Sequence, residues 1–231
     1  MIEFEVAGRY ALFTDPLTRV GGEKSSYHFP TYEAIKGVVS SVYWRPTLIW
    51  IVDRIRIVNR VQTEAKSAKP LDYVSGGNSL AIYTYLKDVR YQIQAHFEWN
   101  FQRDDLRADR IDGKHQDIAK RSIARGGRRD VYLGTRECQA YVTSCRFGNA
   151  AGYYDDIEEL PYGLMFHGYD YPNETGGDAI YARFFRPVVR HGVIEFPRPD
   201  DPSLIRRKLR PAAAQQPEVR TSLEDVLDEL D

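Results

Sequence analysis

The stretch TYEAIKGVVSSVYWRPTLIWIVDRIRIVNRV, residues 31–61, decides the fold because a helix pattern runs directly into a strand pattern. Thr31 can cap the helix, which is expected to end at Arg45-Pro46 because the residue before proline avoids helical dihedral angles. One face of this helix carries Ala34, Val38 and Val42. In the second half, β-branched residues alternate with arginines, and this pattern predicts a strand.

Patterns on both sides extend this helix and strand into a larger unit. Residues 1–13 predict a first strand, because apolar and acidic side chains alternate over residues 2–6, and a polar loop follows. After a second polar loop over 62–79, two strands are expected within 80–100, turning near Lys87-Asp88. Residues 115–127 predict a helix with Ile118, Ser122 and Ile123 inward and Gly126 as its stop. The order predicts an α+β fold, a ferredoxin-like (RRM-like) βαββαβ domain with helices on one face.

The remaining chain divides the protein into three predicted parts. Residues 1–149 form the ferredoxin-like domain, and residues 150–198 form a smaller antiparallel β region with a turn at Arg190-His191-Gly192. Residues 199–231 are expected to be a linker followed by a short acidic tail helix over 221–231. Its apolar residues recur at helical spacing, and Thr221 with Glu224 can form a capping box.

Composition and motifs exclude several function classes. The 231 residues have a net charge of −1, but residues 118–129 are basic without an acid, which allows an anionic partner. Cys138 and Cys145 fall on opposite faces of one predicted strand, and the five histidines are scattered, so no metal site is expected. No phosphate-binding glycine loop, dinucleotide fingerprint or nucleophile elbow occurs.

The chain shows no targeting or membrane signal. It begins directly with a predicted strand, without the pattern of a signal peptide. No apolar run approaches the length that spans a membrane. A cytoplasmic protein is therefore expected, without a membrane association.

Lys114 and His115 form the strongest candidate for chemistry. They follow Gly113 at the start of the basic helix. A histidine can move a proton near neutral pH, and a lysine can stabilise charge that builds on a phosphate oxygen. This pair suits attack of a ribose 2′-hydroxyl on the adjacent phosphodiester, a reaction whose nucleophile belongs to RNA. The alternative is that the two residues are ordinary surface side chains.

Basic residues after this pair are candidates for RNA binding. Arginines flank Gly126-Gly127, a glycine loop that can follow a phosphate backbone closely. Two more basic residues lie one turn earlier and could equally form a solvated helix face. The predicted RNA-binding residues are Lys120, Arg121, Arg125, Arg128 and Arg129.

Several blocks together give the chain a family resemblance. The blocks are FTDPLTRVGGEKSSYHFPTYEAIKGVVSSVYWRP, RPTLIWIVDRIRIVNRV, HFEWN, GKHQDIAKRSIARGGRR, VYLGTRECQAYV and FFRPVVRHGVIEFP. Over about residues 2–198 the chain resembles the CRISPR-associated RAMP-superfamily proteins of subtype I-C (the Dvulg type), which process precursor CRISPR RNA. The tail beyond about residue 200 has no counterpart in the family pattern.

The resemblance implies a fold, an activity and a site. The fold is a ferredoxin-like domain with a small β domain. The activity is metal-independent cleavage at the 3′ base of the repeat hairpin, leaving a 5′-hydroxyl and a 2′,3′-cyclic phosphate and needing no cofactor. The protein then stays on the 5′ handle of the mature RNA with other subunits of a type I-C interference complex. The implied catalytic residues are Tyr43, Lys114 and His115.

Alternatives stay open at this point. Tyr43 could simply close the helix against the sheet. Either Tyr43 or His115 could be the general base, although a phenol needs help because its ordinary pKa is about 10, or His115 could be the acid that protonates the leaving 5′-oxygen. The chain could be a non-catalytic RNA-binding subunit that caps the 5′ end of the guide RNA, or a β-rich interaction protein. The repeat sequence, double-stranded DNA binding and the role of residues 199–231 are not decided by the sequence.

Overall fold

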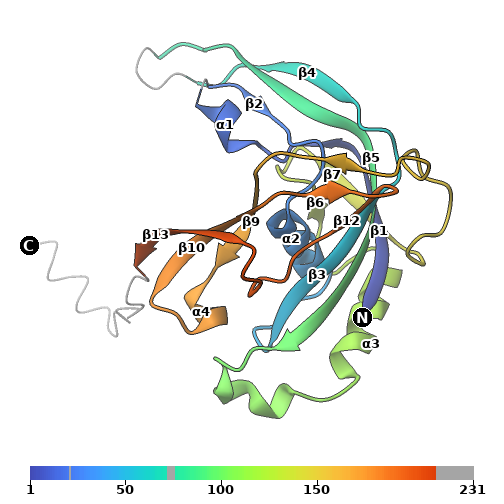
Figure 1. Cartoon of the computed structure of the whole chain (residues 1–231), viewed down its shortest axis with the longest axis vertical. Helices are drawn as coiled ribbons and strands as arrows, with labels where there is room; N and C mark the ends of the chain where they lie inside the picture. Colours follow the sequence, from blue (N-terminus) through green and yellow to red (C-terminus); the bar gives the residue numbers. More distant parts are fainter. Residues whose placement is uncertain (21, 72–75, 212–231) are drawn as a thin grey trace, which may run out of the picture.

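The computed structural model describes residues 1–20, 22–71 and 76–211, and Figure 1 shows its helices and strands. The helical segments are α1 (Pro16–Arg19), α2 (Tyr32–Val42), the 3-10 helix η1 (Asp104–Asp109), α3 (Lys114–Ala124) and α4 (Pro172–Thr175). The strands are β1 (Ile2–Ala11), β2 (Lys24–Ser25), β3 (Leu48–Ile57), β4 (Thr63–Ala68), β5 (Ala81–Trp99), β6 (Val131–Tyr132), β7 (Gln139–Ser144), β8 (Leu160–Pro161), β9 (Met165–Asp170), β10 (Ala179–Phe185), β11 (Val188–Val189), β12 (Val193–Glu195) and β13 (Ile205–Pro211).

A large sheet forms the body of the described chain. Its strands have the order β12-β3-β5-β1-β7-β6. Strands β2 and β4 pair with the N-terminal part of β5. Separate sheets are β13-β10-β9 and β11-β8. Apart from the parallel pairing of β2 with β5, neighbouring strands in the described residues run antiparallel. The architecture is mixed α/β with mostly antiparallel sheets.

Local sequence signals explain the elements that hold the core. In β1 the apolar residues Ile2, Phe4 and Val6 are buried, as the alternation predicts. The Thr31 side chain accepts a hydrogen bond from the Ala34 backbone N–H at 3.1 Å, so the predicted cap is confirmed. Helix α2 contacts both β3 and β9, and it therefore lies between the large sheet and the three-stranded sheet (Figure 1).

The predicted pair of strands within 80–100 is wrong. The region is one strand, β5, of 19 residues that continues through Lys87 and Asp88. Different partners support its two ends: β4 pairs along Ala81–Leu86, while β3 pairs along Tyr91–Trp99. Because β1 bridges the middle of β5, the polar Lys87-Asp88 pair does not need to form a turn.

Two predicted irregular segments contain strands. Strand β4 lies in the segment expected to be a polar loop, and β13 lies in the segment expected to be a linker. Both are edge strands whose residues are exposed or only partly buried, so neither shows an apolar face that sequence could reveal. The predicted tail helix over 221–231 lies outside the described residues.

The predicted helix stop and turn agree with the structure. Gly126 follows α3 with φ of +86°, a conformation that favours glycine. His191 and Gly192 also have positive φ, and Val193 N–H donates to the Arg190 carbonyl at 2.8 Å, which closes the turn before β12. Although β12 lies within 150–198, it pairs with β3 in the large sheet. The division of the chain near residue 150 stays a prediction.

Within the described residues, no helix is long and apolar enough to cross a membrane.

Candidate active site

Tyr43 and His115 meet in the interior although they are 72 positions apart. Tyr43 follows the last residue of α2 in an extended conformation, and its carbonyl accepts a hydrogen bond from Trp50 Nε1 at 2.7 Å. His115 is the second residue of α3. The Tyr43 hydroxyl lies 2.8 Å from His115 Nδ1, and each residue is only 1% exposed. The two helix ends therefore hold a buried phenol–imidazole pair.

The hydrogen bonds of His115 fix its tautomer. Nε2 lies 2.7 Å from the backbone carbonyl oxygen of Asp109, which can only accept. Nε2 therefore carries a hydrogen, and in the neutral ring Nδ1 accepts from the Tyr43 hydroxyl. The rings of Phe97 and Trp99 lie edge-on to the imidazole at centroid distances of 6.2 and 5.6 Å.

Asp109 is a site residue that sequence reasoning missed. Its carboxylate accepts from Lys114 Nζ at 2.5 Å and from the Thr47 hydroxyl at 2.8 Å. The hydrogen bond from Lys114, followed by that from Thr47, lowers the pKa of Asp109 below its usual range. Asp109 thus contacts both members of the Lys114-His115 pair. Its carboxylate binds Lys114 and lies 3.5 Å from His115 Nε2, while its backbone carbonyl takes the shorter contact with Nε2.

The three predicted catalytic residues are adjacent but differ in exposure. The Lys114 side chain is 40% exposed, whereas Tyr43 and His115 are enclosed. Lys114 can contact a phosphate once its ammonium group leaves the Asp109 carboxylate. The His115 imidazole can exchange a proton with the Tyr43 phenol through Nδ1, or through Nε2 with a group that replaces Asp109 there. The chemistry that these groups support is proton transfer beside a positive charge.

The predicted RNA-binding residues lie along the exposed side of α3 and beyond its end. Lys120 and Arg121 are exposed on α3, and Arg125, Arg128 and Arg129 are exposed after it. Backbone N–H groups of Arg128 and Arg129 donate to the Val42 and Ser41 carbonyls at 3.2 and 3.1 Å. These bonds attach the basic glycine loop to the end of α2, directly before Tyr43.

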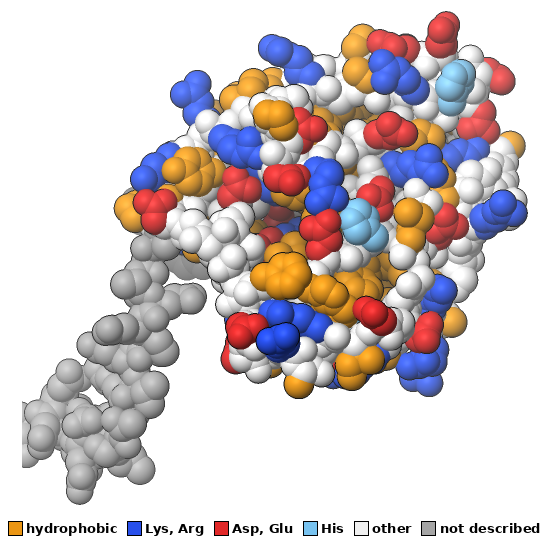
Figure 2. Space-filling view, turned by 60° about the horizontal axis from the view of Figure 1, so that its bottom comes forward, with side chains coloured by type: hydrophobic (Ala, Val, Ile, Leu, Met, Phe, Trp, Pro, Cys, Tyr) orange, Lys and Arg blue, Asp and Glu red, His pale blue; other side chains and the backbone are white. Residues whose placement is uncertain are grey.

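The surface seen in Figure 2 is of mixed charge. On the face seen in Figure 2, basic and acidic side chains are interspersed around exposed apolar groups. This agrees with a net charge of −1. An anionic polymer would therefore be bound by local clusters of basic residues rather than by a field that covers the whole molecule.

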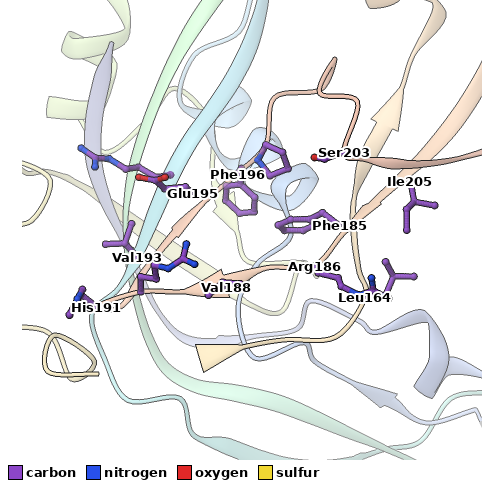
Figure 3. Close-up of a pocket in the computed structure, with 13 residues that line it drawn as sticks. Leu164, Phe185, Arg186, Val188, His191, Val193, Glu195, Phe196, Ser203 and Ile205 are labelled. Atoms are coloured by element: carbon purple, nitrogen blue, oxygen red, sulfur yellow. The ribbon is translucent and has the colours of Figure 1, made fainter. Parts of the chain in front are cut away.

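A cavity in the described part of the chain lies away from this site. It has a volume of about 830 Å³, and Figure 3 shows its walls. Its lining includes Phe185, Phe196, Arg186, His191 and Glu195, from β10, β12 and the segments beside them. None of the predicted catalytic or RNA-binding residues lines this cavity. We assign the candidate site on hydrogen-bond geometry instead of cavity size.

The described residues contain no group of three or more histidine, cysteine, aspartate or glutamate side chains placed to hold a metal ion.

Fold and site together define a mixed α/β protein with a buried phenol–imidazole pair beside an exposed lysine. A family model described as CRISPR-associated protein (Cas_Cas5), of the Cas5d type, matches residues 1–197. The chain belongs to this CRISPR-associated Cas5d family, and the resemblance found in the sequence is confirmed.

Known relatives carry the same family name. The chain is similar to "CRISPR pre-crRNA endoribonuclease Cas5d" of Mannheimia succiniciproducens, with 28% identity over 85% of this chain and 94% of the relative. The protein of that name from Thermus thermophilus is 29% identical over 62% of this chain and 63% of the relative. A solved structure described as "Crystal Structure of CRISPR-associated Protein" is 37% identical, covers 85% of this chain and 91% of its own, and gives a TM-score of 0.71.

Proposed function

We propose that this chain is a metal-independent endoribonuclease that cleaves precursor CRISPR RNA at the base of the repeat hairpin. The nucleophile is the 2′-hydroxyl next to the scissile phosphate. The observation that carries the proposal is the 2.8 Å contact between the Tyr43 hydroxyl and His115 Nδ1, directly beside Lys114. The names of the relatives from Mannheimia succiniciproducens and Thermus thermophilus support the same reaction class.

The hydrogen-bond pattern favours His115 as the proton donor. Its Nε2–H points at the Asp109 carbonyl, so a substrate that takes the place of this carbonyl would face a donor. We assign that place to the leaving 5′-oxygen, which accepts the Nε2 proton as the P–O bond breaks. Nδ1 then takes the phenol proton of Tyr43, and the 2′-hydroxyl proton passes to solvent. Exchange with water then returns a proton to the Tyr43 phenolate and moves the imidazole hydrogen from Nδ1 back to Nε2, which regenerates the starting state.

Lys114 stabilises the charge of the reacting phosphate. In the free protein its ammonium group is bound to the Asp109 carboxylate. A phosphodiester with pentacovalent character carries more negative charge than a carboxylate, so Lys114 moves to it as the reaction proceeds. The phosphate replaces the Asp109 carboxylate at Lys114, and the leaving oxygen replaces the Asp109 carbonyl at His115 Nε2. RNA binding therefore displaces the segment that contains Asp109 from the site.

The strand order supports the finer fold proposal. The central strands β3-β5-β1-β7, with α2 between β1 and β3 and α3 between β5 and β7, have the order expected of a ferredoxin-like βαββαβ domain. The partners expected from the sequence belong to the same proposal. These are precursor and mature CRISPR RNA, bound at the 5′ handle, and other subunits of a type I-C interference complex in the cytoplasm.

A second candidate function rests on burial. Because Tyr43 and His115 are each 1% exposed, a protein that kept this arrangement on RNA would bind without cutting. Such a protein would be a non-catalytic subunit that caps the 5′ end of the guide RNA. Incubation of the purified protein with its cognate repeat RNA in EDTA separates the two functions. We expect one cut at the hairpin base, whereas bound but intact RNA at saturating protein would establish the capping function.

A further inference from the structure

Two exposed aromatic rings lie on either side of the basic glycine loop, here the segment Arg125–Arg129. Trp44 is 50% exposed and Tyr141 is 69% exposed. Strand β7 alternates buried and exposed residues, and this alternation turns Tyr141 outward while Ala140 and Val142 enter the core. Among the described residues, neither ring takes part in a hydrogen bond or ring contact. Both rings are therefore available to another molecule.

Two hollows connect these rings to one arginine. A hollow of about 220 Å³ is lined by Ser40, Ser41, Trp44 and Arg129. A second hollow of about 300 Å³ is lined by the glycine loop and by β7, including Arg129 and Tyr141. Arg129 thus borders both hollows, with one exposed ring on each side.

The backbone fixes this arrangement. The N–H groups of Arg128 and Arg129 donate to carbonyls at the end of α2, so the loop is attached close to Trp44. Gly127 has φ of +106°, and a Cβ there would lie 3.3 Å from the Arg129 carbonyl oxygen. The tight loop therefore requires glycine at this position. The backbone of the loop that lines the second hollow is therefore part of the fold.

The charges point to a polyanion. Lys120, Arg121, Arg125, Arg128 and Arg129 form no ion pair with any described residue. One carboxylate, that of Asp130, lies at the edge of the second hollow. Unpaired arginines next to exposed aromatic rings are how proteins bind single-stranded nucleic acid, with bases stacked on the rings and phosphates on the basic groups.

We infer that Trp44 and Tyr141 each stack an unpaired base of the RNA, with Arg129 holding the phosphate backbone between them. This rests on the proposed function and extends it, because it places the single-stranded RNA that flanks the hairpin. Trp44 directly follows Tyr43, whose side chain points inward to His115. The stacked segment therefore adjoins the cleavage site and sets which phosphate reaches it.

The test measures RNA affinity without cleavage. The probe is fluorescein-labelled cognate repeat RNA with one deoxyribose 5′ of the scissile phosphate, titrated in EDTA at several salt concentrations. Trp44→Ala and Tyr141→Ala should each weaken binding about 5- to 150-fold, the range for losing one stacked base. Their salt dependence should match that of the wild type, because no phosphate contact is lost. Trp44→Phe and Tyr141→Phe keep a ring and should bind within about threefold of the wild type.

An abasic scan of the unpaired nucleotides identifies the stacked bases. An abasic site at one position should weaken binding to the wild type as much as Trp44→Ala does. The same abasic RNA should bind the Trp44→Ala variant no more weakly than intact RNA does. Trp44 fluorescence gives an independent readout, because Trp50 is buried and Trp99 is partly buried. RNA should quench the wild type more than Trp44→Phe.

Distinct outcomes separate this inference from the proposed function. Unchanged affinity in both alanine variants overturns stacking, as would be expected if the rings contact a protein subunit instead. A weaker affinity with a reduced salt slope also overturns it, since the rings would then act only by placing the arginines. If the wild type binds no RNA at all, the proposed function fails first.

Discussion

Tyr43→Phe removes one hydroxyl and leaves the ring in place. The hydroxyl donates to Nδ1 of His115, a ring that is 1% exposed, so the variant leaves a buried acceptor without a partner. An unsatisfied buried group costs about 1–3 kcal/mol. For a chain of this size, each kcal/mol lowers Tm by about 2–4 °C, so the expected fall is about 2–12 °C.

The same change should slow cleavage much more than it affects binding. Without the phenol, Nδ1 has no proton source when Nε2–H is donated, and the tautomer of His115 is no longer fixed by two partners. We expect the single-turnover rate to fall by at least about a hundredfold, the scale for losing general acid–base catalysis. The assay is cleavage of repeat RNA at saturating protein, together with a melting curve of the same sample.

Tyr32→Phe is the matched control. Tyr32 is another buried tyrosine, at the first position of α2, and its hydroxyl lies 3.5 Å from the Trp50 carbonyl, a long contact away from His115. The control should cut RNA within twofold of the wild-type rate. Equal rates for Tyr43→Phe and the wild type, with RNA saturating in both, would refute the role given to the phenol.

Three further predictions follow from other contacts. Asp109→Asn frees Lys114 for phosphate, so RNA affinity at low salt should rise several-fold in a filter-binding assay. The free energy of unfolding should fall by about 1 kcal/mol or less, because both side chains are partly exposed. Weaker RNA binding would contradict the transfer of Lys114 from Asp109 to the phosphate. Arg128→Ala with Arg129→Ala should reduce the salt slope of binding by about 0.7 for each lost contact with a single-strand phosphate, and cleavage at saturating protein should stay near the wild-type rate; an unchanged slope would make these arginines a solvated surface. Burial lowers the pKa of His167 to about 3 in the folded chain. As pH falls below about 6.5, the histidine is therefore protonated in the unfolded chain and stays neutral in the folded one, so the free energy of unfolding should drop by about 2 kcal/mol between pH 7 and pH 5. Urea melts at both pH values should show a smaller drop in His167→Gln, and an equal drop would assign the pH dependence to other groups.

The elements that sequence predicted well have local causes. Helix α2 combines a capping threonine with an apolar face, and α3 ends at a glycine whose positive φ stops it. Strand β5 was misread because a polar pair at Lys87-Asp88 is a common turn signal, whereas pairing partners on both sides decide that the strand continues. Exposed edge strands such as β4 and β13 have no buried side, and hydrophobic patterns cannot show them.

The candidate site also depends on contacts between distant parts of the chain, and only some of its features could be predicted from the sequence. The resemblance named Tyr43, Lys114 and His115, and the Lys114-His115 pair was expected at the start of the basic helix, but the burial of His115 was not predicted. Its spacing with Ala119 and Ile123, four and eight residues on, could have indicated this, since all three are on the buried face of α3. Asp109 gave no signal, because its contacts depend on how the chain folds back before α3.

The central claim is that the RNA supplies its own nucleophile beside Tyr43, Lys114 and His115. One deoxyribose just 5′ of the scissile phosphate tests this most directly, in EDTA and with single-turnover protein. We predict that the all-ribose repeat RNA is cut once, leaving a 2′,3′-cyclic phosphate and a 5′-hydroxyl. The deoxy substrate should bind with nearly the same affinity and stay intact. Cleavage of the deoxy substrate at a comparable rate would contradict internal attack and the mechanism built on it.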